Sequence, residues 1–256
     1  VFIEPYIERG RHIEVQIMGD QHGNVVHMGE RECSIQRRNQ KVIEESPSSG
    51  ISEATRQAVC DGAIALATQV GYVGAGTVEF LVGQNGDGTD TINFLEVNTR
   101  LQVEHPVTEA VTGFDLVEMQ LRVAAGEPLS VDQSDVCISG HAIEVRIVAE
   151  NPTTNWMPST GLIAAFEISD DVRTDTGIRS GAEVSPNYDS LLAKVISSAP
   201  TRRDAARQLA RALRSAQITG VDTNVNMLVA TLGERDFLAA DTPTAYLAEH
   251  PAVLTP

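Results

Sequence analysis

Residues 93–109, NFLEVNTRLQVEHPVTE, carry polar side chains at every second position. Such alternation is typical of a strand that turns one face to a core and the other to solvent or to a ligand. Carboxylate and amide oxygens bind hard cations such as Mg²⁺, a guanidinium binds oxyanions, and a carboxylate can act as a base. The run therefore predicts metal and anion chemistry. Its polar members are Glu96, Asn98, Arg100, Gln102 and Glu104.

This run cannot be one straight strand that serves one small site. Eight residues at about 3.3 Å each separate Glu96 from Glu104 by roughly 26 Å. We therefore predict a bend within residues 99–102. After the bend, Arg100 offers a planar fork to an oxyanion, Gln102 an amide and Glu104 a base. Taken alone, Arg100 and Glu104 would more often form an ordinary surface salt bridge.

A second carboxylate is predicted to face Glu96. The segment before the run alternates in the same way and reads as the other strand of a β-hairpin, and we predict a register that pairs Val82 with Asn93. This register places Glu79 directly opposite Glu96, with Cβ atoms about 4.5 to 5.5 Å apart. Mg²⁺ or Mn²⁺ would compensate the two like charges, with Asn98 as a further oxygen ligand. The alternative is a solvated polar face, which the apolar neighbours of Glu79 disfavour.

The remaining elements follow from periodicity and capping residues. Two alternating strands flank the GDQHGN turn of residues 19–24, and their apolar face is expected to meet a core while the polar face points away. After a charged loop, a helix is predicted to begin at Ser52 and to end at Gly71. A further helix is predicted over residues 114–125.

The second half of the chain begins after a polar stretch at residues 127–135, the best candidate for a boundary. Residues 140–150 alternate as a strand, and Thr201 with Asp204 has the spacing of a capping box before an amphipathic helix. Hairpins and helices without regular strand–helix alternation favour an α+β fold class.

Composition excludes several classes of function. The 256 residues include 35 Asp and Glu but only 19 Lys and Arg, a net charge of -16 that argues against a general nucleic-acid or membrane-surface binder. No apolar run has the length of a membrane span. The three scattered cysteines, Cys33, Cys60 and Cys137, favour a reducing compartment, so we expect a cytoplasmic protein. Because a strand-like segment begins at Val1, we also expect the natural N-terminus to be missing.

Three longer segments resemble the biotin carboxylase family of ATP-grasp enzymes. They are ERECSIQRRNQKVIEE at residues 30–45, FLEVNTRLQVEHPVTE at 94–109 and GHAIEVRIVAE at 140–150. The resemblance covers essentially the whole chain. It implies that residues 1–127 form the later part of an ATP-grasp domain, an antiparallel sheet with helices. Residues 137–250 would form the α+β C-terminal domain of the family.

The resemblance also implies roles for individual residues. Glu104 would be the base that deprotonates bicarbonate, Arg146 would stabilise the biotin enolate, and Arg100 and Lys41 would complete the catalytic set. The implied bicarbonate ligands are Arg100, Gln102, Val103 through its backbone, and Lys41. The implied ATP ligands are Glu4, Ile7, His12, Gln36, Lys41, Glu79 and Glu96. The implied metal ligands are Glu79, Glu96 and Asn98.

Each of these roles has a plainer alternative. His12 would otherwise be an ordinary strand histidine beside Arg11. Lys41, one of only two lysines, would be one more solvated charge in the loop. Arg146 would pair with Glu144 or Glu150 on a wet strand face.

The implied activity is ATP-dependent carboxylation of carrier-bound biotin by bicarbonate, through carboxyphosphate, in the alpha component of an acetyl-, propionyl- or other acyl-CoA carboxylase. The expected cofactors are ATP with Mg²⁺ or Mn²⁺, with biotin as the substrate, and the expected partners are a biotin carboxyl carrier domain, a carboxyltransferase and further copies of the chain. Alternatives are the same domain of a pyruvate or urea carboxylase, a ligase of the carbamoyl phosphate synthetase type, or a non-catalytic fragment. The chain lacks the family's first domain and glycine-rich phosphate loop, so we do not expect it to turn over alone.

Overall fold

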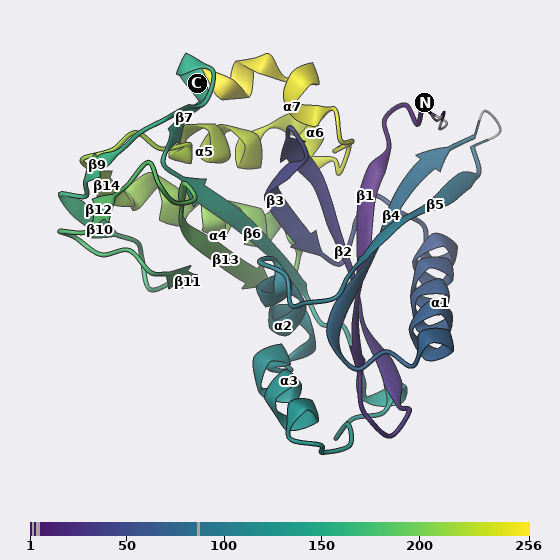
Figure 1. The fold of residues 1–256 in the computed structure, drawn as a ribbon. Helices are drawn as coiled ribbons and strands as arrows, with labels where there is room; N and C mark the ends of the chain where they lie inside the picture. The colour runs from purple at the N-terminus through teal and green to yellow at the C-terminus, as the bar shows by residue number, and fades with distance from the viewer. Residues whose placement is uncertain (2, 4–5, 86–87) are drawn as a thin grey trace.

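Strands and helices alternate irregularly in the computed structural model, which describes residues 1, 3, 6–85 and 88–256 (Figure 1). Eight strands form one sheet in the order β11-β13-β6-β3-β2-β1-β4-β5, and each neighbouring pair is antiparallel. The strands are β1 (Arg11–Gly19), β2 (Val25–Arg37), β3 (Gln40–Ser46), β4 (Gly74–Gln84), β5 (Asp90–Asn98), β6 (His141–Val148), β11 (Arg173–Thr176) and β13 (Leu191–Ala199).

Short strands form three separate pairs in the second half of the chain. These are β7 (Glu150–Asn151) with β8 (Met157–Pro158), β9 (Gly161–Leu162) with β12 (Glu183–Val184), and β10 (Ala165–Glu167) with β14 (Gln217–Thr219). The α-helices are α1 (Glu53–Val70), α2 (His105–Thr112), α3 (Leu116–Ala124), α4 (Arg202–Ser215), α5 (Val225–Gly233), α6 (Arg235–Leu238) and α7 (Tyr246–Glu249). The 3₁₀ turns are η1 (Gln133–Asp135), η2 (Pro152–Thr154) and η3 (Pro251–Leu254). The α+β class is therefore confirmed. Within the described residues, no helix is long and apolar enough to cross a membrane.

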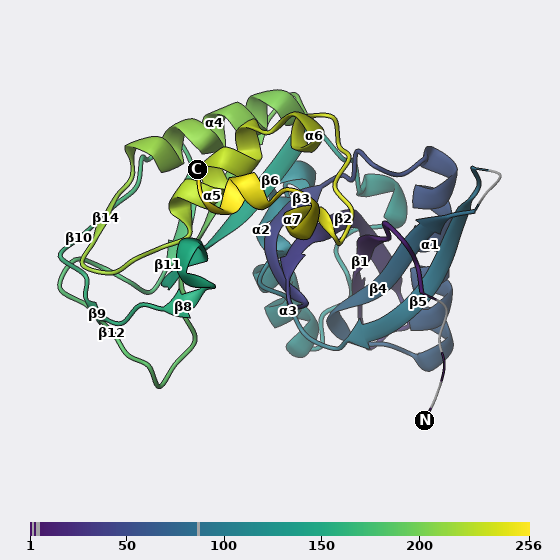
Figure 2. The ribbon, with the colours of Figure 1, turned by 90° about the horizontal axis from the view of Figure 1, so that it is seen from above.

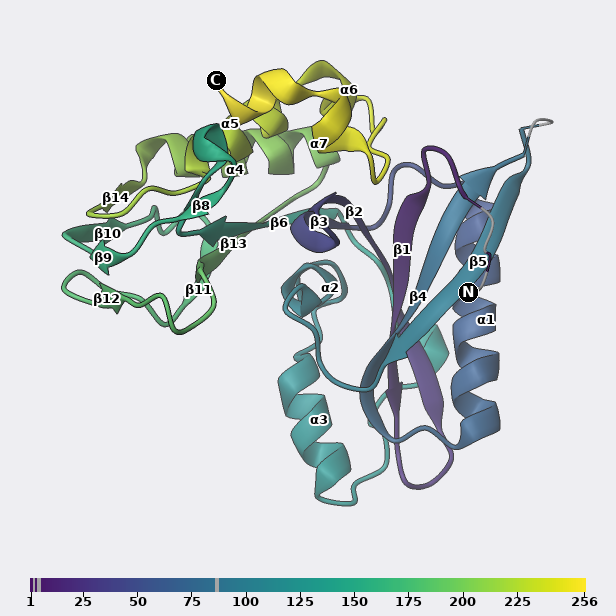
Figure 3. The ribbon, with the colours of Figure 1, turned by 45° about the horizontal axis from the view of Figure 1, so that its top comes forward.

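Helices cover both faces of the sheet (Figure 3). Helix α1 packs on β1 and β4 around Ile13, Val15 and Val78, whereas α2 and α3 lie on the opposite face. Helices α4 and α5 pack on β6 and β13 at the other end of the sheet, which Figure 2 shows as a second lobe. Strands β3 and β6 join the two lobes by direct pairing.

The predicted helix ends are confirmed where a cap defines them. The Ser52 side chain accepts a hydrogen bond from the Thr55 N–H at 3.1 Å at the start of α1. Gly71 ends α1 in the left-handed conformation, with φ of 61°, which glycine adopts without strain. Thr201 caps α4 as its spacing predicts, because its hydroxyl accepts from the Asp204 N–H.

One prediction about the elements is wrong. The charged loop expected after β2 contains strand β3, which fills the gap between β2 and β6 in the sheet. Helix α2, which begins at His105, was not predicted. A smaller difference is that α3 begins at Leu116, after an Asp115 cap, and not at Phe114.

Two residues on the polar face of β1 are buried as completely as the apolar face. Glu14 and Gln16 are 0% exposed, although alternation predicted that they would point away from the core. The turn between β5 and α2 places Gln102 over this face, and α2 adds Thr108. This arrangement produces a polar interior above the sheet, and the candidate site lies there.

Candidate functional site

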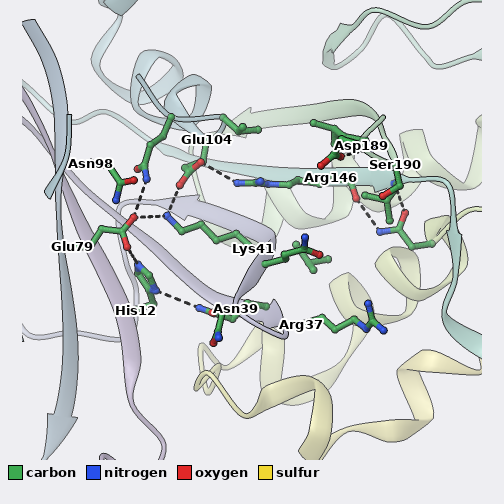
Figure 4. Close-up of a pocket in the computed structure, with 18 of the residues that line it drawn as sticks. His12, Arg37, Asn39, Lys41, Glu79, Asn98, Glu104, Arg146, Asp189 and Ser190 are labelled. Atoms are coloured by element: carbon green, nitrogen blue, oxygen red, sulfur yellow. Dashed lines mark hydrogen bonds and ion pairs between the residues drawn. The ribbon is translucent and has the colours of Figure 1, made fainter. Parts of the chain in front are cut away.

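A cavity of about 1000 Å³ opens above β1, β3, β4 and β6 (Figure 4). It collects nearly all of the predicted site residues that the structure describes. These lining residues are His12, Gln36, Lys41, Glu79, Glu96, Asn98, Arg100, Gln102, Val103, Glu104 and Arg146. Ile7 lies outside the cavity, against Gly10 and Gly83. Glu4 lies outside the described residues.

The predicted bend lets both halves of the polar run line the same cavity. Strand β5 ends at Asn98 and α2 begins at His105, so residues 99–104 form a turn. Glu79 and Glu104 both contact the Lys41 ammonium, although one belongs to the hairpin and the other to the turn. A bent chain was the condition for a shared site, and the structure confirms it.

Lys41 lies at the centre of the site, on β3. Its Nζ donates to Glu14, to Glu79 Oε1 at 2.9 Å and to Glu104 Oε1 at 2.6 Å. Burial lowers the pKa of the Lys41 ammonium, but Glu14 and the other carboxylates outweigh it and raise the pKa above the ordinary value. The alternative of a solvated loop lysine is therefore wrong.

Glu79 and Glu96 face each other across the hairpin as predicted. The register differs in detail, because Leu81, not Val82, pairs with Asn93, and a bulge at Leu95 restores the expected pairing. The bulge also explains why Leu95 reaches the cavity.

The Glu79 carboxylate is held by three side chains. Its Oε2 lies 2.9 Å from His12 Nε2, and its Oε1 accepts from Gln102 Nε2 at 2.8 Å as well as from Lys41. Burial alone would raise the pKa of this carboxyl, but the His12 hydrogen bond and Lys41 bring it well below its usual range. Gln36 supports His12 from behind, because its Nε2 lies 3.3 Å from His12 Nδ1.

Glu104 joins Lys41 to Arg146. The second oxygen of Glu104 accepts from Arg146 Nη2 at 3.0 Å, and Arg146 Nε donates to Glu44 at 2.5 Å. The alternatives of a pair between Arg146 and Glu144 or Glu150 are not what the structure shows. A carboxylate between an ammonium and a guanidinium at the edge of a cavity is placed to exchange a proton with a bound oxyacid.

The rim of the cavity carries several of the predicted ligand-binding residues. Arg100 is exposed and donates to Asn98 Oδ1 at 3.1 Å, not to Glu104. Asn98 in turn donates to Glu96 Oε1 at 3.2 Å, and Glu96 is exposed. Val103 lines the cavity, and its carbonyl accepts from Lys194 Nζ at 2.7 Å.

The residues fit a hard divalent cation. Glu79, Glu96 and Asn98 offer only oxygen ligands and lie on neighbouring strands at one wall. Among the described residues, three sets of His, Cys, Asp or Glu bring their ligand atoms within 4.8 Å of one another, and the set that includes Glu79 also comprises His12 and Glu14. Its Glu14 is fully buried and already paired with a buried arginine. We therefore favour the all-oxygen set for Mg²⁺.

Several residues of the site were not predicted. Arg31 is fully buried under the cavity and donates to Glu14 Oε1 at 2.5 Å and to Gln16, while Glu44 anchors Arg146. Trp156 lines the far wall, with the Arg37 guanidinium 4.7 Å from its ring centroid. The only signal for Glu14 and Glu44 in the sequence is their place on strand faces, which does not tell whether a face is covered.

Two family models together match nearly the whole chain. Residues 1–132 match the carbamoyl-phosphate synthase L chain, ATP binding domain, and residues 144–249 match the biotin carboxylase C-terminal domain. The chain belongs to the biotin carboxylase family. Curated family members include biotin carboxylase of Halalkalibacterium halodurans, 48% identical over 100% of this chain and 56% of that protein. Another is the propionyl-CoA carboxylase alpha chain of Ruegeria pomeroyi, 46% identical over 97% of this chain and 39% of that protein.

Solved biotin carboxylases share the fold. The biotin carboxylase subunit of a pyruvate carboxylase aligns with a TM-score of 0.92 and 45% identity, over 98% of this chain and 55% of that one. The biotin carboxylase domain of the Hydrogenobacter thermophilus 2-oxoglutarate carboxylase, in complex with MgADP, ADP and bicarbonate, aligns with a TM-score of 0.93 and 42% identity, over 98% of this chain and 55% of that one. The chain thus spans about half or less of the length of these relatives.

Proposed function

We propose that the protein containing this chain is an ATP-dependent biotin carboxylase. The observation that carries the proposal is the bridge of Lys41, Glu104 and Arg146 in one cavity with the opposed carboxylates Glu79 and Glu96. Such a site offers carboxylate oxygens for the metal ion of a metal–nucleotide complex and cations for bicarbonate. It also offers a carboxylate base, Glu104, between the two cations. Membership of the family and the solved relative with MgADP and bicarbonate support this reading.

The nucleotide is proposed to bind along the side of the cavity that carries Glu79, Glu96 and Asn98. Glu79, Glu96 and Asn98 would hold Mg²⁺ or Mn²⁺, which when bound neutralises charge on the transferring phosphoryl group. His12 and Gln36 would contact the nucleotide beside Glu79. Further nucleotide contacts are proposed for Lys41 from the cavity floor and for Glu4 and Ile7 from the N-terminal segment.

Bicarbonate is proposed to bind between the rim and Lys41. The Arg100 guanidinium, the Gln102 amide, the Val103 backbone N–H and the Lys41 ammonium would hold its oxygens. Glu104 would take its proton, and the bicarbonate oxygen would attack the γ-phosphorus of ATP, releasing ADP and leaving carboxyphosphate. Carboxyphosphate would break down to CO₂ and phosphate, the released phosphate would take the ureido N–H proton of biotin, and the nitrogen would bond to the carbon of CO₂.

Arg146 is proposed to stabilise the biotin enolate. A guanidinium stays charged at neutral pH and so can stabilise an oxyanion without taking its proton. Arg146 is about 19% exposed at the cavity and already reaches Glu104. In this proposal, the enolate oxygen of biotin and the bound bicarbonate would both lie beside Glu104.

The biological setting is proposed from the relatives. Alpha chains of propionyl-CoA and methylcrotonoyl-CoA carboxylases match the chain, so an acyl-CoA carboxylase is proposed, with a biotin carrier domain and a carboxyltransferase as partners and with self-association. A division into domains at residues 1–127 and 137–250 is supported by the limits of the two family matches. A cytoplasmic location is supported by the free cysteines Cys33, Cys60 and Cys137.

The test is ATP cleavage by the complete natural protein that carries this chain. We expect cleavage that requires both bicarbonate and biotin, and at least a roughly hundredfold loss in Glu104→Gln. Cleavage no faster than in Glu104→Gln would refute the proposal. Cleavage that needs bicarbonate but not biotin would instead indicate a ligase of the carbamoyl phosphate synthetase type.

A further inference from the structure

Two glutamates face each other beneath Arg146. Glu44 on β3 and Glu144 on β6 are directly paired across the antiparallel strands, and both are 0% exposed. Directly opposed residues have Cβ atoms about 4.5 to 5.5 Å apart. The two carboxyl groups therefore lie close together in the buried interior.

Most of the oxygens of this pair have no donor. Glu44 Oε1 accepts from Arg146 Nε at 2.5 Å. Within the described residues, Glu44 Oε2 and both oxygens of Glu144 are buried without a hydrogen-bond partner. A buried carboxylate without donors is strongly destabilising, and two such like charges repel as well. One proton on the pair relieves both problems, because it removes one charge and supplies an O–H donor.

The charges around the pair do not replace this proton. Arg146 and Lys41 act on Glu44 as cations, but Glu104 opposes them as an anion. Lys194 on β13 is the additional cation that acts on Glu144, and its ammonium already binds the Val103 carbonyl.

Among the residues that the structure describes, the other elements packed here add no further cation in contact with the pair. Helix α2 covers this face mainly with Val107 and Val111, which pack on Ala142 and Ile196. Its His105 ring bonds to the Gln102 carbonyl, and its Glu109 bonds to Arg173 and to the Leu116 N–H. Strand β2 contributes the buried Cys33 thiol, whose pKa is raised first by burial.

We propose that Glu44 and Glu144 share one proton and together form a positioning pair that fixes the Arg146 guanidinium beside Glu104. Glu144 is the protonated member, and its O–H is directed at Glu44. Glu44 keeps the charge that holds Arg146 Nε, which leaves Nη2 of the same guanidinium on Glu104. The role in catalysis rests on the proposed function of Arg146, whereas the shared proton does not.

The direction of the two pKa values agrees with this division. Burial first, and then the Glu44 charge, raises the pKa of Glu144 well above its ordinary value. Burial also raises the pKa of Glu44, but Arg146 opposes it and the result is about 7. Glu44 therefore carries its charge above about pH 7 and loses it as the pH falls through this value, and its hold on Arg146 weakens in the same direction.

The proton is tested by infrared difference spectroscopy on the complete natural protein near pH 8. We expect a C=O stretching band of a protonated carboxyl group that disappears in Glu144→Gln. The same band should persist in Glu183→Gln, a matched change at an exposed strand residue. Persistence of the band in Glu144→Gln, or its absence from the wild-type protein, would overturn the shared proton.

The positioning role is tested first by NMR and then by kinetics. The Arg146 Nε–H signal, assigned through Arg146→Lys, should be visible in the wild type and lost in Glu44→Gln. In biotin-dependent ATP cleavage, Glu44→Gln should lower kcat/KM about tenfold near pH 8, because a charged hydrogen bond is lost. The difference in kcat/KM between the wild type and Glu44→Gln should nearly vanish at about pH 6. At this pH wild-type Glu44 is itself roughly nine-tenths protonated.

The outcomes separate this inference from the proposed function. A deficit that is the same at all pH values indicates a merely structural role and contradicts the positioning pair, as does an unchanged Nε–H signal. A wild-type protein without biotin-dependent cleavage would instead remove the proposed function. In that case the infrared band and the Nε–H signal still decide whether the pair holds a proton and Arg146.

Discussion

The buried charges of the site are tolerated because each one is compensated by another. Glu14 is fully buried, and burial alone would raise the pKa of its carboxyl. Arg31 and then Lys41 reverse the effect and bring the pKa of Glu14 to about 2. Lys41 also forms ion pairs with Glu79 and Glu104, so one ammonium serves three carboxylates. Such a network is sensitive to the loss of its central member.

Lys41→Met should therefore be much more damaging than a surface change. It leaves Glu14, Glu79 and Glu104 close together without their shared cation, and we expect a loss of about 3 kcal/mol in the free energy of unfolding. Urea unfolding of the complete protein measures the loss. Arg38→Met, at an exposed position in the turn between β2 and β3, is the control and should change stability by less than about 0.5 kcal/mol. Equal effects of the two variants would argue against a central role for Lys41.

The proposed metal ligands Glu79, Glu96 and Asn98 give a second prediction for single residues. Glu96 is exposed, so Glu96→Gln should weaken Mn²⁺ binding in the nucleotide complex at least about tenfold without unfolding the protein. Paramagnetic broadening of ATP resonances by Mn²⁺ measures it. Glu167→Gln, at another exposed strand residue, should leave the broadening intact. Full broadening in Glu96→Gln would remove this residue from the metal set.

At the scale of residues, the sequence predicted contacts that follow from the alternation of side chains along a strand. It did not predict contacts that depend on which strand face is covered by another element. The opposition of Glu79 and Glu96 followed from hairpin register, although the bulge at Leu95 was not foreseen. Glu14 and Glu44 were missed because alternation assigns a residue to a face but cannot show what covers that face. Contacts such as Arg31 with Glu14 join strands through the fold, so no local spacing predicts them.

The turn between β5 and α2 is the element on which the site depends most. It carries Arg100, Gln102 and Glu104 within a few residues. Two of its backbone carbonyls accept hydrogen bonds from side chains outside the turn. The His105 ring bonds to the Gln102 carbonyl at 2.7 Å, and Lys194 Nζ donates to the Val103 carbonyl at 2.7 Å. Since Lys194 comes from β13, the second lobe helps to set the position of this turn.

Lys194→Met should disturb bicarbonate binding more than nucleotide binding. Without the ammonium, the Val103 carbonyl loses its donor and the turn is free to shift, so KM for bicarbonate should rise about tenfold. KM for ATP should change by less than about twofold, and Lys194→Arg should recover part of the effect. Steady-state kinetics of the complete protein measures both constants. A parallel rise in both would mean that Lys194 supports the fold in general and not this turn.

At the scale of elements, prediction succeeded where local chemistry ends an element. Helix α1 has both a serine cap and a left-handed glycine, and the sequence predicted both ends of the helix from these residues. Strand β3 was taken for a loop because its residues QKVIEES mix charge with only a short apolar core. It is a strand because β2 and β6 supply hydrogen bonds on its two sides, which is long-range information.

The whole molecule is tied together across its two lobes. The sheet runs without interruption through β3 and β6, although the first family match ends before β6 and the second begins within it. The C-terminal segment also returns to the first lobe, where the Thr244 N–H donates to the Gly10 carbonyl and Arg9 pairs with Asp241. Figure 2 shows the last helices beside β2 and β3. We therefore expect the lobes to unfold together.

Glu45 is the buried charge that best reports this coupling. It lies on β3 and accepts from Arg202 of α4 through both oxygens, at 2.5 and 2.8 Å, and from His141 of β6 at 2.7 Å. Burial would raise the pKa of Glu45, but Arg202 and then His141 bring it to about 2. A lowered carboxyl pKa stabilises the fold above the ordinary value near 4.5, and the contribution is lost as the pH falls toward about 2.

Arg202→Ala should therefore weaken the whole molecule and change its response to acid. Removing the guanidinium leaves Glu45 with only the His141 ring, and the free energy of unfolding should fall by about 3 kcal/mol at neutral pH. Because the pKa of Glu45 then returns toward 4.5 or above, stability should depend less steeply on pH below this value than in the wild type. Urea unfolding across pH, followed separately by Trp156 fluorescence in the second lobe and by far-ultraviolet circular dichroism, measures both effects. Arg203→Ala, the exposed neighbour on the same helix, should leave the curve unchanged. If the two probes separated in the wild type, the lobes would unfold independently, and the ion pair could not be the link between them.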